Sequence, residues 1–134
     1  MDATFFLRVK TDFPSLKFVT GRKFAFRPPK TVVLPEDTSD CNPLLVLHEI
    51  GHALIGIFDF STEIDRLKIE VMAWEKAREL CSRYKVEVDE DLIQGELDSY
   101  RDWLHQKSRC PECGLTRFQT PDGVFHCPKC DIIS

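Results

Sequence analysis

The stretch NPLLVLHEIGHALI, residues 42–55, decides the fold of this chain of 134 residues. Asn42 and Pro43 are residue types that begin helices, because an asparagine side chain caps free N–H groups and proline fits the first turn. The apolar residues that follow surround two histidines and a glutamate. The stretch therefore predicts a largely buried helix, and its polar side chains need partners because unpaired buried polar groups are costly.

The polar residues of this helix form an H-E-x-x-H pattern: His48, Glu49 and His52. On a helix the two imidazoles stand one turn apart on the same face, so both can bind one Zn²⁺ while Glu49 points toward a water on the ion. Two histidines and a glutamate can also fall at this spacing by chance. The capped, apolar helix around them favours the metal site.

A catalytic zinc usually has three protein ligands and a water, so the pattern lacks one ligand. The next helix is predicted from about Thr62 to Tyr84, capped by Ser61, and Glu70 falls in the middle of its apolar stripe. A carboxylate there should be metal-bound or paired, with Arg66 as the paired alternative. Glu63, on the same face near the helix start, is the rival ligand, although it can simply complement the helix dipole.

Residues 48–54 and 70–74 together resemble the minimal gluzincin metallopeptidases and, more distantly, the ImmA/IrrE-type peptidases, which carry an H-E-x-x-H helix and an E-x-E-A-N helix. The resemblance covers at most residues 18 to 84. It implies that Glu70 is the third zinc ligand. Met72 stands where the pattern often has an acid, and Trp74 stands where it has asparagine.

A second resemblance, to the SprT-like proteases, is poorer. Those proteases also combine H-E-x-x-H with a C-terminal zinc-binding segment, but they use a third histidine as the ligand. The later histidines of this chain, His105 and His126, do not lie on the helix after the motif.

The function predicted from this site is hydrolysis of peptide bonds in a peptide or protein substrate. Zinc would activate a water, and Glu49 would take its proton as the general base. The segment Thr31–Leu34, predicted as a strand, would hold the extended substrate by edge pairing. Gluzincin-like enzymes usually add a tyrosine or histidine near the oxyanion, and Tyr84, Tyr100 and His105 all remain candidates.

Four of the six cysteines form two C-x-x-C pairs separated by thirteen residues: Cys110, Cys113, Cys127 and Cys130. This spacing is typical of a zinc ribbon, in which each pair supplies half of a tetrahedral site. A redox dithiol is the alternative, but it needs only one pair. Pro121–Gly123 predicts a hairpin turn between the pairs. Of the other two cysteines, Cys81 reads as a core residue and Cys41 as a loop residue without a role.

Four short β-prone runs precede the motif helix: Phe5–Val9, Lys17–Val19, Lys23–Arg27 and Thr31–Leu34. A third helix is predicted from about Val88 to Gln106, with an apolar stripe that reads as core. The predicted fold is α+β: a small antiparallel sheet of three to four strands followed by three helices and a zinc ribbon. We expect a minimal zincin-like metallopeptidase domain over residues 1–106 and a Cys₄ zinc ribbon over residues 107–134, with two Zn²⁺ per chain.

The net charge of −4 is unevenly distributed. Residues 1–35 carry seven basic and two acidic residues, whereas residues 36–105 carry seven basic and seventeen acidic ones. The acidic middle argues against broad nucleic-acid binding by the helical body. No run resembles a signal peptide or a membrane span, so the sequence predicts a cytoplasmic protein without a membrane partner.

The rival function is a zinc-dependent interaction module. In that case the ribbon binds a protein or a nucleic acid, and the H-E-x-x-H site is vestigial or structural. Glu49 argues against the rival, because a structural site has no use for a glutamate beside the first histidine.

Overall fold

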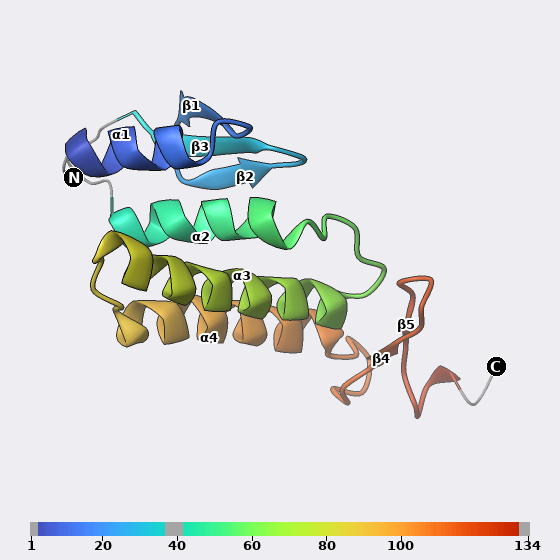
Figure 1. Cartoon of the computed structure of the whole chain (residues 1–134). Coiled ribbons are helices and arrows are strands. Elements are labelled where there is room, and N and C mark those ends of the chain that lie inside the picture. Colours follow the sequence, from blue (N-terminus) through green and yellow to red (C-terminus); the bar gives the residue numbers. More distant parts are fainter. Residues whose placement is uncertain (1–2, 37–41, 132–134) are drawn as a thin grey trace. The chain divides into compact units, whose positions relative to one another are not determined.

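The computed structural model describes residues 3–36 and 42–131, and its α+β class confirms the prediction (Figure 1). Contacts divide the chain into a first unit, Met1–Phe58 with Val71–Asp89, and a second unit, Asp59–Glu70 with Glu90–Ser134. The predicted boundary between residues 106 and 107 stays a prediction. In chain order the elements are α1 (Ala3–Asp12), β1 (Lys17–Gly21), β2 (Ala25–Arg27), β3 (Thr31–Pro35), α2 (Pro43–Ile55), α3 (Glu63–Tyr84), α4 (Glu90–Ser108), β4 (Phe118–Gln119) and β5 (Phe125–His126).

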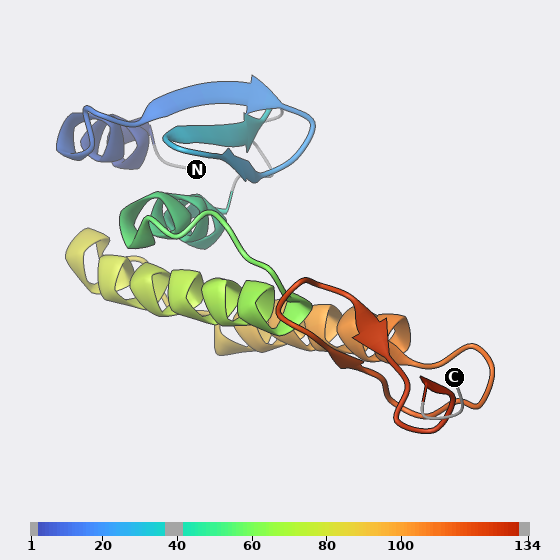
Figure 2. The same cartoon turned by 90° about the vertical axis from the view of Figure 1, so that its right-hand side faces the viewer.

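The sheet of the first unit has three strands in the order β1-β3-β2, so β3 is the central strand (Figures 1 and 2). β2 and β3 form an antiparallel hairpin, whereas β1 pairs with β3 in parallel. The sheet is therefore mixed rather than antiparallel as predicted. The prediction missed that β3 lies between β1 and β2. The alternation of apolar and polar residues along each strand does not encode this order.

The prediction of a strand at Phe5–Val9 is wrong, because these residues belong to α1. Val9 is fully buried, and Phe5 meets the ring of Tyr84 edge-on at 5.8 Å between centroids. Phe5 and Val9 are four residues apart, which places them on one face of a helix. A short apolar run fits a strand and a helix equally well. Here the contact of Phe5 with Tyr84 favours the helix.

The motif helix α2 begins as predicted. The Asn42 side chain accepts a hydrogen bond from the N–H of Leu44 at 2.9 Å, and Gly56 ends the helix with a left-handed φ of 68°. α2 packs against β2 and β3. A Cβ atom at Gly51 would lie 2.6 Å from the backbone oxygen of Ala73, so glycine allows α2 and α3 to approach closely at this point.

The two long helices after α2 are also as predicted, apart from their ends. Thr62, not Ser61, caps α3, since its hydroxyl accepts a hydrogen bond from the N–H of Asp65 at 3.2 Å. Cys81 is buried in α3 as the core residue expected, and its burial raises the pKa of its thiol. In α4 the apolar stripe is buried only in part, because Trp103 is 43% exposed.

Cys41 lies outside the described residues. Among the residues that the structure describes, no helix is both long and apolar enough to cross a membrane.

Candidate metal centres

The first candidate centre is on α2, where the donor atoms of His48, Glu49 and His52 lie within 4.8 Å of one another. His48 and Glu49 are buried, and His52 is half-buried. Nδ1 of His48 is 3.5 Å from Oε1 of Glu49. Imidazole nitrogens and carboxylate oxygens are common ligands of zinc, so this donor set fits the ion predicted.

Aromatic rings hold both histidines in place. The ring of His48 stacks on the indole of Trp74, with centroids 3.9 Å apart and planes within 3° of parallel. The ring of His52 stacks on Phe26 at 6.0 Å, and Phe26 in turn contacts Phe58 at 5.7 Å. Stacking covers the faces of the imidazoles, whereas a metal binds to a nitrogen at the ring edge.

Neither stacking partner was predicted from the sequence. Trp74 stands where the ImmA/IrrE pattern has asparagine, and in the structure it contacts His48 through its ring face. Phe26 lies 26 residues before His52, on β2. No spacing along the chain marks it as a neighbour of the motif.

Glu70, the predicted third ligand, lies on α3 in the second unit and is half-buried. Its carboxylate is close enough to Tyr100 to contribute to a raised pKa of that hydroxyl. On α3, Glu70 precedes Trp74 by four residues, one turn of an uninterrupted helix. Its role as a ligand stays a prediction.

Glu63, the rival ligand, is buried among partners of its own. Its carboxylate lies 3.0 Å from Nζ of Lys107, 3.8 Å from Nη1 of Arg66 and 3.5 Å from the hydroxyl of Tyr100. These contacts account for its burial without a metal. The Arg66 guanidinium, the predicted alternative partner of Glu70, pairs with Glu63 and also lies over the rings of Phe60, Tyr100 and Trp103.

The three candidates for oxyanion contact differ in their surroundings. The Tyr84 hydroxyl donates a hydrogen bond to Asp12 at 2.6 Å, and burial together with this bond raises its pKa to about 12. Burial, with the carboxylates of Glu63 and Glu70, raises the pKa of Tyr100 to about 12. Both tyrosines are therefore protonated at neutral pH. His105 is exposed on α4.

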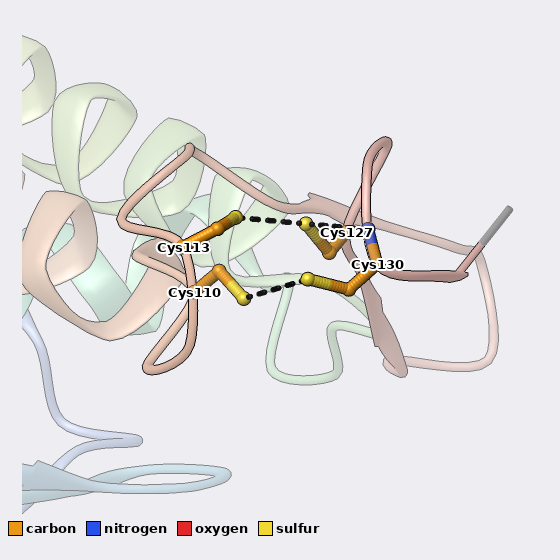
Figure 3. A group of neighbouring side chains, drawn as sticks. All are labelled: Cys110, Cys113, Cys127 and Cys130. Atoms are coloured by element: carbon orange, nitrogen blue, oxygen red, sulfur yellow. Dashed lines mark hydrogen bonds between the residues drawn. The ribbon is translucent and has the colours of Figure 1, made fainter. Parts of the chain in front are cut away.

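The second candidate centre is the cluster of four cysteines, whose sulfur atoms lie within 4.8 Å of one another (Figure 3). Sγ of Cys110 is 3.9 Å from that of Cys130, and Sγ of Cys113 is 3.5 Å from that of Cys127. All four are free thiols. Four sulfurs that converge from two C-x-x-C turns fit a tetrahedral zinc, as predicted.

The pKa values of Cys110 and Cys130 are shifted in opposite directions. Backbone N–H groups of Cys113 and Glu112 lower the pKa of Cys110 to about 7, whereas the sulfurs of Cys127 and Cys113 raise that of Cys130 to about 12. Neighbouring thiols at these distances share protons, because several thiolate charges repel one another unless a cation lies between them. A divalent metal supplies that charge and binds thiolates.

A short antiparallel hairpin, β4 and β5, joins the two pairs of cysteines. Its turn contains Gly123 with a φ of 87°, within the predicted turn Pro121–Gly123. Gln119 on β4 connects the ribbon to α3: its Oε1 accepts a hydrogen bond from the N–H of Glu63 at 2.6 Å, and its Nε2 donates to the carbonyl of Gly123 at 2.8 Å. No pattern in the sequence predicts this contact, which joins residues 56 positions apart.

Comparisons of the chain with models of protein families, with curated proteins and with solved structures find no match. The resemblance to gluzincin peptidases therefore depends on the motif residues themselves. The described residues contain two groups of side chains that could bind a metal ion. One group consists of two histidines and a glutamate, and the other consists of four cysteines.

Proposed function

We propose that this chain is a zinc-dependent peptidase in which His48 and His52 bind a catalytic zinc and Glu49 is the general base. The observation that carries the proposal is the convergence of their three side chains within 4.8 Å on α2. A structural zinc site would use the two histidines but would gain nothing from a buried carboxylate beside them. Peptide hydrolysis gives each of the three residues a role.

Glu70 is proposed as the third ligand. Its support comes from α3, which runs without a break through Glu70 and Trp74. Trp74 stacks on His48, and residues four apart share one face of a helix. The rival Glu63 already has Lys107 and Arg66 as partners.

The residues of the site would divide the reaction between them. His48 and His52, with Glu70, would hold the zinc, which would supply a water of lowered pKa and polarise the carbonyl of the scissile bond. Glu49 would accept the proton of that water and donate it to the leaving amine. Trp74 and Phe26 would keep the imidazole planes fixed and exclude bulk water from their faces.

The strand expected to hold the substrate, Thr31–Leu34, cannot pair with it. It forms most of β3, which is bonded to β1 on one side and to β2 on the other. β2 is proposed in its place, because within the described residues β3 is its one partner strand and its Phe26 stacks on His52. An extended peptide added to the outer edge of β2 would pass beside the histidines.

The test is the substitution Glu49→Gln in the full chain loaded with zinc. We expect two zinc ions per chain before and after the change, and a loss of about 10²- to 10⁴-fold in cleavage of mixed fluorogenic peptides. Glu75→Gln is the matched control, since Glu75 is an exposed carboxylate on α3. Full hydrolysis by the Glu49→Gln protein would refute the assignment of the general base.

A second function, binding of a macromolecule by the ribbon, is supported by its surface. Three apolar side chains of the ribbon, Leu115, Phe118 and Val124, are between 45% and 55% exposed. Exposed apolar groups on a small module are available for contact with a partner. Retention on immobilised DNA or RNA that falls steeply with salt would indicate a nucleic-acid partner, whereas retention that is insensitive to salt would not.

A further inference from the structure

A groove of about 620 Å³ lies in the first unit between α1 and the edge of the sheet. Most of its wall is apolar, and Lys10 is the charged residue that lines it. It is lined by Phe6, Lys10, Phe18, Val19, Thr20, Leu34 and Pro35. The groove is therefore a site where a partner could bury apolar side chains next to one positive charge.

One wall of the groove is β1, whose outer edge has no strand partner within the described residues. The N–H of Lys17 donates to Lys30 at 2.8 Å, and the carbonyl of Gly21 accepts from Glu36 at 3.0 Å. In a parallel pair, alternate residues face the neighbouring strand. The N–H and C=O groups of Phe18 and Thr20 therefore point away from β3, toward the open edge.

An open edge beside an apolar groove offers both parts of a site for strand addition. The edge gives main-chain hydrogen bonds, and the groove receives every second side chain of the added strand. Phe6 and Lys10 lie four residues apart on one face of α1, with the Lys10 ammonium 5.4 Å from the centre of the Phe6 ring. A side chain in the groove would thus meet an aromatic ring and a cation together.

The charged residues around the groove indicate which kind of partner it would bind. Lys17 is the first residue of β1 and comes directly before the strand residues that line the groove. Arg22 and Lys23 follow the strand. Asp12, the acidic residue at the end of α1, is already bonded to Tyr84 and paired with Arg83 at 3.4 Å. Glu36 follows the groove residue Pro35, but basic residues outnumber acidic ones beside the groove, so their charge favours an acidic partner.

We propose that the groove between α1 and β1 binds an extended acidic segment of a partner protein. Apolar side chains alternate with carboxylates in this segment, which adds as a strand to the outer edge of β1. The groove shares no residue with either metal centre, and the proposal does not depend on peptide hydrolysis.

The test uses two fluorescein-labelled peptides of nine residues, one alternating valine with glutamate and one alternating valine with lysine. Fluorescence anisotropy with the full, zinc-loaded chain should show binding of the glutamate peptide and at least about tenfold weaker binding of the lysine peptide. Lys10→Glu should abolish that preference. Lys68→Glu, an exposed lysine on α3, is the control for the same change of charge and should leave it unaltered.

The main-chain part of the proposal has its own pair of variants. Thr20→Pro removes an outward N–H without removing a bond to β3, so it should weaken binding of the glutamate peptide by at least about tenfold. Thr20→Val keeps the N–H and should bind as the unaltered chain does. Equal binding by the two variants, or equal binding of both peptides, would overturn the proposal.

Hydrogen exchange of the unaltered chain gives an answer even if Thr20→Pro does not fold. The glutamate peptide should slow exchange at the amides of Phe18 and Thr20 and leave the amide of Lys17, already bonded to Lys30, unchanged. No slowing at Phe18 and Thr20 would contradict strand addition. A concentration-dependent dimer that protects the same two amides without peptide would assign the edge to a second copy of the chain and overturn the proposal.

Discussion

The two candidate metal centres differ in the elements that carry their ligands. The four cysteines fall within residues 110–130 and converge through two turns and a short hairpin. The histidines and Glu49 come from one helix, but the proposed third ligand, Glu70, is on another. The ribbon site is thus built locally, whereas a histidine site completed by Glu70 would depend on how helices pack. Substitutions at a distance should therefore affect the histidine site and spare the ribbon site.

The largest effect is expected from Cys113→Ser. A structural Cys₄ zinc contributes on the order of 10 kcal/mol of binding free energy that is also folding free energy, so loss of one thiolate should release the ion and unfold the ribbon. Mass spectrometry under native conditions should find one zinc per chain in place of two. Cys81→Ala, which removes a buried thiol outside the ribbon, should keep both ions.

The next effect separates the two glutamates of α3. Glu70→Ala should lower the zinc affinity of the histidine site by more than about 100-fold, because even partners of zinc ligands contribute 10- to 100-fold. The ribbon zinc should remain. Glu63→Gln should keep both ions and reduce the free energy of unfolding by about 1–3 kcal/mol, since Lys107 loses a charged partner. If zinc titration shows the opposite pattern, Glu63 is the ligand.

Two helical glycines test whether packing of α2 controls the histidine site. Gly51→Ala would place a Cβ 2.6 Å from the backbone oxygen of Ala73, so it should cost about 1–3 kcal/mol of unfolding free energy and weaken zinc binding by His48 and His52. Gly95→Ala meets nothing within 4 Å and should stabilise α4 by about 0.5–1 kcal/mol. Urea unfolding measures both changes. Equal effects of the two substitutions would contradict the close approach of α2 and α3.

The fold also makes stability depend on alkaline pH. The fold raises the pKa of Tyr84 from 10.0 to about 12, so it favours the neutral phenol. This contribution is complete below about pH 10 and is lost as the pH rises from about 10 to about 12. The difference in unfolding free energy between the unaltered chain and Tyr84→Phe should therefore shrink over that range. Tyr100→Phe is the corresponding variant in the second unit, because its pKa is also raised to about 12.

Much of the helical structure could be predicted because its signals are local. Asn42 and Pro43 mark the start of α2, and α3 and α4 are long enough for their apolar period to be unambiguous. The first helix was not predicted, since the run Phe5–Val9 is too short to distinguish a period of two from one of 3.6. The order of the strands was not predicted either, because pairing between β1 and β3 joins residues fourteen positions apart.

The sequence by itself determined which side chains can bind metal. Two histidines four apart on a helix, and two C-x-x-C pairs around a hairpin, converge through local backbone geometry alone. Only the tertiary structure decided what surrounds them: Trp74 against His48, Phe26 against His52, and Lys107 against Glu63. Those contacts join segments far apart in the chain, and they follow from close packing of side chains, which no periodicity along the sequence records.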